Sequence, residues 1–196
     1  MWPPQYVVTL IMTTTLSPSG EGSPSTVFVI MGVSGSGKST IGESLATRLG
    51  VKFIDGDHLH PQSNIDKMSA KQPLNDEDRR PWLNNINRII HQLNVDNLTG
   101  VLVCSALRRN YRDIIRNNNR VVFIYLKAEF GVILSRLQKR AEHFMPADLL
   151  ESQFQTLEEP DPLVEPDVRT VSVNEPLEGI VSKCCNIVRT CRGANS

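Results

Sequence analysis

The sequence has no net charge and few aromatic residues. Its 21 basic residues are matched by 21 acidic ones, and aromatic residues make up 6% of the 196 positions. Proteins that bind nucleic acid or a charged membrane surface usually carry an excess of basic residues. Because the charges balance here, we expect neither kind of partner. The sequence also lacks any apolar run near the roughly 20 residues that a membrane-spanning helix needs.

Cysteine is sparse, and its spacing does not suit a metal site. The chain has four cysteines and no C-x-x-C pair. Cys184 and Cys185 are neighbours, and Cys191 follows six residues later with no histidine close by. Structural zinc sites use more regular spacing than this. We therefore expect reduced thiols, as in a cytoplasmic protein.

Strand-like and helix-like segments alternate after residue 26. Residues 1–25 hold one charge and many Pro, Ser and Thr residues, which predicts a disordered extension before a single domain over 26–192. Strands are predicted at 27–31, 51–55, 101–106, 121–126 and 169–173, with helices such as 38–49, 129–140, 146–157 and 177–191 between or after them. This order predicts an α/β fold, a three-layer α/β/α sandwich around a five-stranded parallel sheet. Ligands in such folds bind at the carboxyl ends of the strands.

A glycine-rich loop follows the first predicted strand. The stretch "VFVIMGVSGSGKST" fits the pattern G-x-x-x-x-G-K-[ST] at every fixed position. The glycines let successive backbone N–H groups point at a phosphate chain, and the following helix adds its positive dipole end. In this pattern the lysine reaches the β- and γ-phosphates, and the next hydroxyl binds Mg²⁺. We expect ATP to bind through Gly32, Ser34, Gly35, Ser36, Gly37, Lys38, Ser39 and Thr40.

Two carboxylates, Asp55 and Asp57, close the second predicted strand. On an extended chain, side chains two positions apart point to the same side. One carboxylate, Asp55, is then expected beside a magnesium ion, together with Ser39. The other, Asp57, is expected to accept the proton of an alcohol as it takes up a phosphoryl group. A solvated turn without function is the alternative reading of this segment.

Several basic residues fall where an anionic acceptor could bind. Lys67, Arg79 and Arg112 are the candidates, since arginine recognises a carboxylate through two parallel hydrogen bonds. Arg136 and Arg140 lie one helical turn apart and share a face of their predicted helix. For each of these residues a solvated, charged helix face is the alternative.

Taken together, these motifs resemble those of the gluconokinases, small phosphate-loop kinases related to shikimate and nucleoside monophosphate kinases. The matching stretches appear in order and include "MGVSGSGKST", "DGDHLHP", "PLNDEDRRPWL", "CSALRRNYRD" and "PLEGIV". The resemblance implies phosphorylation of D-gluconate by ATP, giving 6-phospho-D-gluconate and ADP for the pentose phosphate pathway, and a homodimer. It implies a helical lid over about 136–157, in which Arg136 and Arg140 neutralise charge on the transferring phosphoryl group. It assigns Asp57, Lys67, Arg79 and Arg112 to the acceptor. One departure is Arg108-Arg109, where family members commonly have two lysines.

Two other functions are compatible with a phosphate loop. A kinase for another small acceptor, such as shikimate, a nucleotide or a different sugar acid, would use the same fold. A shikimate kinase would usually have a glycine-rich turn after the third strand, which "CSALRR" is not. A nucleotide-dependent switch or binding protein is the second alternative. A GTPase would need an N-K-x-D guanine-binding motif, and the sequence has none.

Overall fold

The computed structural model describes residues 25–70, 72–138 and 147–193. The predicted N-terminal extension lies outside these residues except for Ser25. That residue is buried, and its backbone N–H donates to Asn97 Oδ1 over 3.0 Å. Ser25 therefore packs with the domain, one residue before the predicted boundary.

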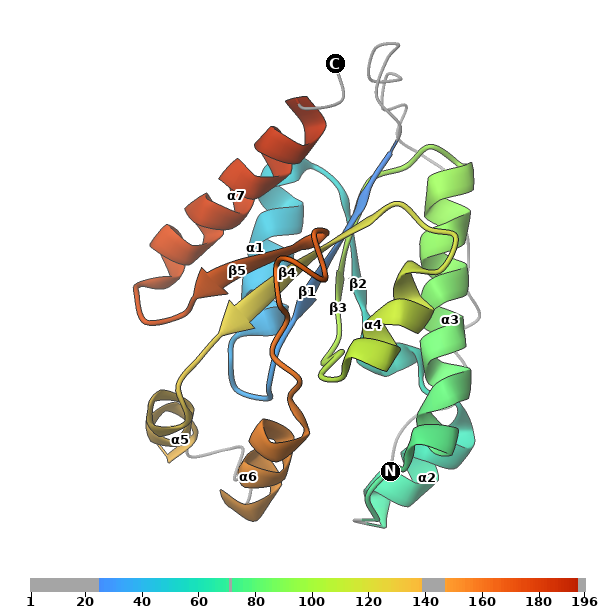
Figure 1. Cartoon of the computed structure of the whole chain (residues 1–196), viewed down its shortest axis with the longest axis vertical. Helices are drawn as coiled ribbons and strands as arrows, with labels where there is room; N and C mark the ends of the chain where they lie inside the picture. Colours follow the sequence, from blue (N-terminus) through green and yellow to red (C-terminus); the bar gives the residue numbers. More distant parts are fainter. Residues whose placement is uncertain (1–24, 71, 139–146, 194–196) are drawn as a thin grey trace.

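A five-stranded parallel sheet forms the centre of the molecule (Figure 1). Its strands follow the order β2-β3-β1-β4-β5, and every pair of neighbours is parallel. Because all strands run in one direction, their carboxyl ends meet at a single edge of the sheet. The predicted fold class is thus confirmed. The strands are β1 (Val27–Met31), β2 (Lys52–Asp55), β3 (Gly100–Val103), β4 (Val121–Lys127) and β5 (Val168–Ser172).

Helices cover both faces of the sheet. One face packs against α1 (Lys38–Leu49) and α7 (Leu177–Gly193), and the other against α3 (Asp76–Val95) and α4 (Arg109–Arg116) (Figure 1). Residues of β1 alternate between the two cores, since Val27 and Val29 point to α3 and α4 while Phe28 points to α1 and α7. Such apolar side chains on both faces are typical of a buried parallel strand.

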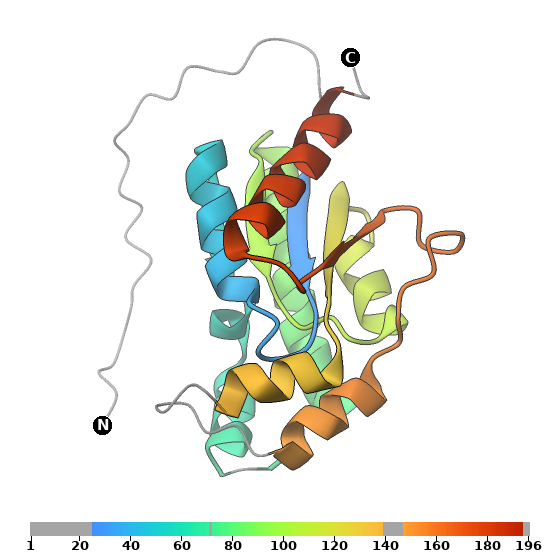
Figure 2. The same ribbon diagram turned by 90° about the vertical axis from the view of Figure 1, so that its left-hand side faces the viewer.

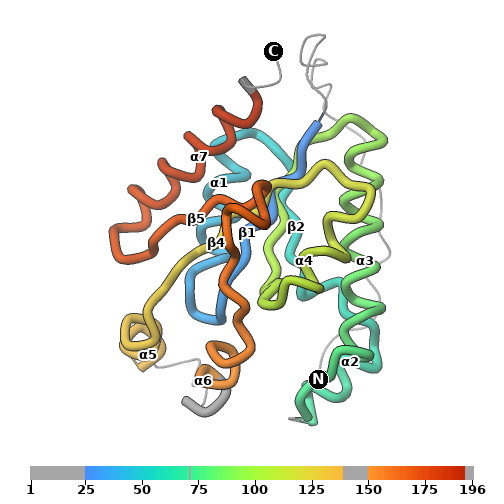
Figure 3. The backbone as a smooth tube through the Cα atoms, viewed as in Figure 1, coloured from blue at the N-terminus to red at the C-terminus, as the bar shows by residue number. Residues whose placement is uncertain are grey.

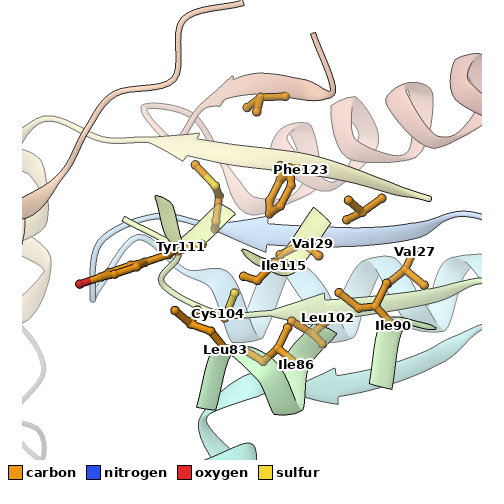
Figure 4. Close-up of a cluster of buried hydrophobic side chains, with 14 of the residues drawn as sticks. Val27, Val29, Leu83, Ile86, Ile90, Leu102, Cys104, Tyr111, Ile115 and Phe123 are labelled. Atoms are coloured by element: carbon orange, nitrogen blue, oxygen red, sulfur yellow. The ribbon is translucent and has the colours of Figure 1, made fainter. Parts of the chain in front are cut away.

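The core beneath α3 and α4 extends to the carboxyl edge of the sheet. Figure 4 shows Leu83, Ile86 and Ile90 of α3 meeting residues of β1, β3 and β4. Tyr111 of α4 lies at the border of this cluster, with its hydroxyl group pointing out of it. Packing in this core thus fixes the position of α4 and leaves the hydroxyl group of Tyr111 at the edge of the sheet.

Short helices gather at the carboxyl edge, as Figures 1 and 3 show. They are α2 (Gln62–Ser69), α5 (Phe130–Gln138), α6 (Ala147–Thr156) and the 3₁₀ helix η1 (Gly56–Leu59). The helix predicted over 146–157 matches α6 closely, whereas the sequence did not predict η1. In the described part of the chain, no helix combines the length and apolarity required to cross a membrane.

Candidate active site

The glycine-rich loop joins β1 to α1 at the carboxyl edge, and its backbone requires glycine. Gly35 and Gly37 have φ angles of 78° and 95°, in the left-handed region that disfavours other residues. A Cβ atom on Gly35 would also come within 2.9 Å of Ile133 Cγ2 on α5. The loop therefore owes its shape both to backbone freedom and to close packing against α5.

Backbone donors of the loop are open to a ligand. Helix α1 begins at Lys38 without a side-chain cap, and it has no acidic residue in its first turn. Among the residues that the structure describes, no acceptor pairs with the backbone N–H of Gly35 or Gly37. Free N–H groups at a helix start, together with the helix dipole, favour an anion such as phosphate.

Lys38 curls back over this loop. Its ammonium group donates to the backbone oxygen of Val33 over 3.0 Å. Burial lowers the pKa of Lys38, and the negative charges of Asp57 and Asp55 partly oppose that shift. The lysine thus lies close enough to both carboxylates for their charges to interact, while it stays anchored to the phosphate loop.

The sequence analysis assumed an extended chain over Asp55-Gly56-Asp57, but the structure has the start of a 3₁₀ helix there. Asp55 ends β2, and its Oδ1 accepts a hydrogen bond of 2.9 Å from the backbone N–H of Asp57 at the start of η1. Desolvation by the surrounding protein raises the pKa of the Asp57 carboxyl, and the nearby Asp55 charge raises it further. A higher pKa makes a carboxylate a stronger base.

The donor set near the loop fits a magnesium ion. Mg²⁺ prefers oxygen ligands and keeps several waters, so that one or two protein oxygens and substrate phosphates suffice. Ser39 contributes an exposed hydroxyl in the first turn of α1, and Asp55 has one carboxylate oxygen beyond that used by Asp57. Within the described ranges, no cluster of three or more His, Cys, Asp or Glu side chains could hold a metal without a substrate.

Beside η1, helices α2 and α3 build a polar wall. His60 stacks on Trp82 with ring centroids 4.4 Å apart and 9° between the planes. Burial and the charge of Arg79 lower the pKa of His60 to about 4, so the ring is neutral at pH 7. Lys67 binds Asp78 over 2.6 Å through an ion pair. Lys67 and Arg79 therefore lie in the same region, since both are close to Asp78.

A second group of side chains joins α3 to the start of α4. Tyr111 donates its hydroxyl proton to Asp76, and Arg108 pairs with the same carboxylate over 3.0 Å. The guanidinium groups of Arg79 and Arg108 each lie 5.9 Å from the centre of the Tyr111 ring. Two cations thus converge on one aromatic side chain at the edge of the core.

Arg112 does not join these cations, and the expectation that it binds the acceptor is corrected. It is fully buried, and it forms a bidentate ion pair with Glu165, with hydrogen bonds of 2.8 and 2.6 Å. Its other three N–H groups donate to the backbone oxygens of Ala106, Leu107 and Glu158. All five donors are used inside the protein, so none is left to bind a substrate.

Arg136 lies beside the end of β5. It donates to the backbone oxygen of Val173 over 2.6 Å. With Val132, Asn174, Glu175 and Pro176 it lines a cavity of about 400 Å³. Arg140, predicted beside it, and residues 139–146 of the predicted lid lie outside the described residues.

Comparisons with known proteins show what the chain as a whole is similar to. A family model described as shikimate kinase matches residues 34–185. The "Thermoresistant gluconokinase" of Escherichia coli K12 is 45% identical over 164 residues, which cover 83% of this chain and 93% of that protein. The "Thermosensitive gluconokinase" of the same organism is 47% identical and covers 84% and 88%.

This chain belongs to the gluconokinase family. Among solved structures, a gluconokinase from Sinorhizobium meliloti 1021 is 40% identical, with a TM-score of 0.76 over 87% of this chain and 95% of that one. The resemblance inferred from the motifs is thus confirmed. The gluconokinase assignment also makes this chain an enzyme, a kinase with a phosphate loop for ATP.

Sequence reasoning missed two residues at the edge of this gluconokinase fold. One is Asp76 of α3, which binds both Tyr111 and Arg108. Gln153 of α6 accepts a hydrogen bond of 2.7 Å from the backbone N–H of Ser34 in the phosphate loop. A signal for Gln153 was present, because an amide side chain stands between Leu150, Phe154 and Leu157 on the apolar face of α6.

Proposed function

We propose that this chain transfers the terminal phosphoryl group of ATP to the C6 hydroxyl of D-gluconate, giving 6-phospho-D-gluconate and ADP. The observation that carries the proposal is the position of Asp57. It lies in η1, which α3 holds through hydrogen bonds from Trp82 and Asn85, and it is close enough to Lys38 of the phosphate loop for their charges to interact. An alcohol that binds against the polar wall of α2 and α3 would have a base on one side and a phosphate chain on the other.

The reaction needs one proton acceptor and several groups that stabilise negative charge. The C6 oxygen forms a bond to phosphorus, the bond from phosphorus to the bridging oxygen of ADP breaks, and the hydroxyl proton passes to Asp57. The open N–H groups of Gly35 and Gly37 and the ammonium of Lys38 bind the phosphate oxygens. A bound Mg²⁺ would neutralise phosphate charge, and Ser39 and Asp55 are the residues that would hold it.

The acceptor's carboxylate requires cations on this polar wall. Arg79 is a good candidate, because its only described hydrogen bond is to the backbone oxygen of Leu74 and its guanidinium has five donors. Lys67 is already paired with Asp78, but its side chain remains 40% exposed and can still reach a ligand. We therefore keep Arg79 and Lys67 as gluconate ligands and leave Arg112 out.

The nucleoside end of ATP is assigned to the cavity beside β5. A phosphate loop fixes the phosphates, so the base must lie within reach of that loop. Arg136 lines this cavity, and its helix α5 also contacts Gly35 through Ile133. We accordingly assign Arg136 to the nucleotide, whereas Arg140 keeps the role in phosphoryl transfer that the sequence predicted.

We also propose that the enzyme is a cytoplasmic homodimer that binds neither nucleic acid nor membranes. Exposed apolar side chains support a protein interface at the far end of α3, where Val95 is 65% and Leu98 is 53% exposed. Light scattering of the purified protein would test this, with twice the chain mass expected and the mass of one chain contradicting it.

The function is tested by measuring ADP release with Mg²⁺ and ATP against a panel of acceptors. The panel contains D-gluconate, related sugar acids, shikimate and nucleoside monophosphates, and Lys38→Met serves as the inactive control. Release that depends on D-gluconate and is lost in Lys38→Met is the expected result. Release with another acceptor would support a kinase activity but overturn the assignment of D-gluconate as the substrate. No release with any acceptor, despite ATP binding, would overturn the proposed reaction.

A further inference from the structure

A side chain of α6 contacts the backbone of the phosphate loop. The Oε1 atom of Gln153 accepts a hydrogen bond of 2.7 Å from the N–H of Ser34, a residue 119 positions away in the sequence. Figure 2 shows α5 and α6 beneath the loop that joins β1 to α1. In the described part of the chain, no other side-chain oxygen accepts a hydrogen bond from a backbone N–H of this loop.

The peptide unit that Gln153 binds also holds the catalytic lysine. The N–H of Ser34 and the carbonyl of Val33 belong to the same planar peptide group, and in a trans peptide they point in opposite directions. On the carbonyl side, Val33 accepts from the Lys38 ammonium over 3.0 Å and from the N–H of Ser36 over 3.3 Å. The orientation of this one peptide group therefore links α6 to Lys38.

Apolar packing supports the contact on both sides. Val33 is 2% exposed, and it packs in a cluster with Ile133 of α5 and Leu150 of α6. Phe154 and Leu157 continue the same face of α6 and pack against this cluster. Gln153 lies among these residues, so its amide group reaches the loop from a surface that packing has already fixed.

The far end of α6 is anchored to the acceptor side of the site. The backbone N–H of Glu158 donates to Leu107 over 2.9 Å, and the Glu158 carboxylate accepts from the N–H of Arg109 over 2.7 Å. Arg112 donates to the backbone oxygen of Glu158 as well. These bonds hold the end of α6 against the start of α4. The backbone position of Gln153 in α6 is therefore fixed.

We propose that Gln153 is a positioning residue, which fixes the Val33–Ser34 peptide group and through it the place of the Lys38 ammonium over the phosphate loop. The inference rests on the proposed function only in that Lys38 binds the phosphates of ATP. Gln153 itself does not touch the nucleotide. Its effect appears in phosphate binding, whereas binding of the acceptor is left unchanged.

The test compares Gln153→Met with Gln155→Met. Methionine keeps an unbranched side chain of similar length but removes the acceptor. Gln155 lies on the exposed side of α6, and Glu151 is its one side-chain partner among the residues that the structure describes, so its variant serves as the matched control. The primary measurements are the Kd for ADP and the hydrogen exchange of the Ser34 amide, neither of which requires gluconate.

We expect Gln153→Met to weaken ADP binding by about 2- to 10-fold, as befits one lost hydrogen bond. The Ser34 amide should exchange faster, while the KM for D-gluconate and the melting temperature stay near those of Gln155→Met. Equal ADP affinity in both variants would overturn the proposal, as would an unchanged Ser34 amide. A fall in melting temperature with no change in ADP affinity would also overturn it, because it would indicate packing alone.

A second variant covers the case in which Gln153→Met does not fold. Gln153→Glu keeps an oxygen acceptor at the same reach, so the Ser34 amide should stay as protected as in the unsubstituted protein. Fast exchange of Ser34 in that variant would contradict the proposal. If the protein binds ADP but phosphorylates no gluconate, these measurements still stand, so failure of the proposed reaction is distinguishable from failure of this inference.

Discussion

The two sides of the carboxyl edge are built in different ways. The phosphate side is one continuous stretch, residues 32–38, whose backbone conformation depends on its own glycines. The acceptor side is assembled from η1, α2, α3 and α4, which are separate in sequence. A continuous motif can be recognised from sequence because its function resides in its backbone. The function of an assembled wall depends instead on which side chains keep hydrogen-bonding groups that the folded protein does not use.

Lys38 and Arg112 illustrate that difference. Both are basic residues near the carboxyl ends of neighbouring strands, and the sequence analysis assigned both to ligands. Lys38 has one described hydrogen bond, to its own loop. Arg112 donates all five of its N–H groups to protein acceptors. The first is therefore free to bind phosphate, and the second holds the structure together.

The largest effect is expected for Lys38→Met. Removing the ammonium takes away the positive charge that we assign to the transferring phosphoryl group, and we expect this loss to lower kcat by about 10²–10³-fold. The unfolding midpoint in urea should change little. Steady-state kinetics and urea titration measure both quantities. Turnover within a few-fold of the unsubstituted enzyme would contradict the assignment of residues 32–38 as the site that binds the transferring phosphate.

Asp57→Asn tests the point where the two sides meet. We expect turnover to fall by at least about 10²-fold, because the amide cannot accept the proton, while ADP affinity is largely kept. In the unsubstituted enzyme, activity should fall at acidic pH around a pKa above the ordinary aspartate value, since the Asp57 pKa is raised. A pH profile of kcat/KM shows this acidic limb. Unchanged turnover in Asp57→Asn would show that Asp57 is not the acceptor of the hydroxyl proton.

Arg112→Met tests the structural side of the comparison. Burial alone would raise the pKa of Glu165, but the hydrogen bonds from Arg112 and Arg116 lower it below the ordinary value. Removing Arg112 leaves that carboxylate buried with less compensation, which costs about 3–5 kcal/mol of the free energy of unfolding. Urea denaturation followed by circular dichroism would measure the loss.

Arg79→Met is the matched control for Arg112→Met. We expect it to raise the KM for D-gluconate by about 10-fold, as for the loss of a charged hydrogen bond, with a much smaller change in stability. The reverse pattern, in which Arg112→Met raises KM without loss of stability, would invalidate the structural assignment of Arg112.

The smallest effect concerns the pH dependence of stability. The pKa of His60 is about 4 in the folded protein, against an ordinary value of 6.5. The unfolded chain therefore binds more protons between these values, so stability is complete above pH 6.5 and falls as the pH drops towards 4. His60→Phe keeps a ring against Trp82 but cannot be protonated.

We expect that variant to lose about 1 kcal/mol less stability than the unsubstituted protein between pH 7 and pH 5. Urea titrations at the two pH values give the comparison. An identical loss in both proteins would mean that His60 is not protonated differently on folding.

Most of the fold could be predicted because its signals are local. Each strand is a short apolar run, and the capping box at Asn75 and Asp78 marks the start of α3 in the sequence. The turn at η1 could not be predicted, because the Asp55 side chain bonds the chain two residues on and replaces the extended conformation. Arg112 was misassigned because its partners, Glu158 and Glu165, come from a segment 46 and 53 residues away.

The chemical identity of the product is the most direct test of the proposed reaction. The enzyme is incubated with Mg²⁺, ATP and D-gluconate, and the ³¹P NMR spectrum is recorded with proton coupling. We expect a new phosphomonoester signal split into a triplet, because a phosphate on C6 couples to the two protons of that carbon. A doublet would place the phosphate on a secondary hydroxyl and contradict the geometry at Asp57, and the absence of any new phosphomonoester would contradict the proposed reaction itself.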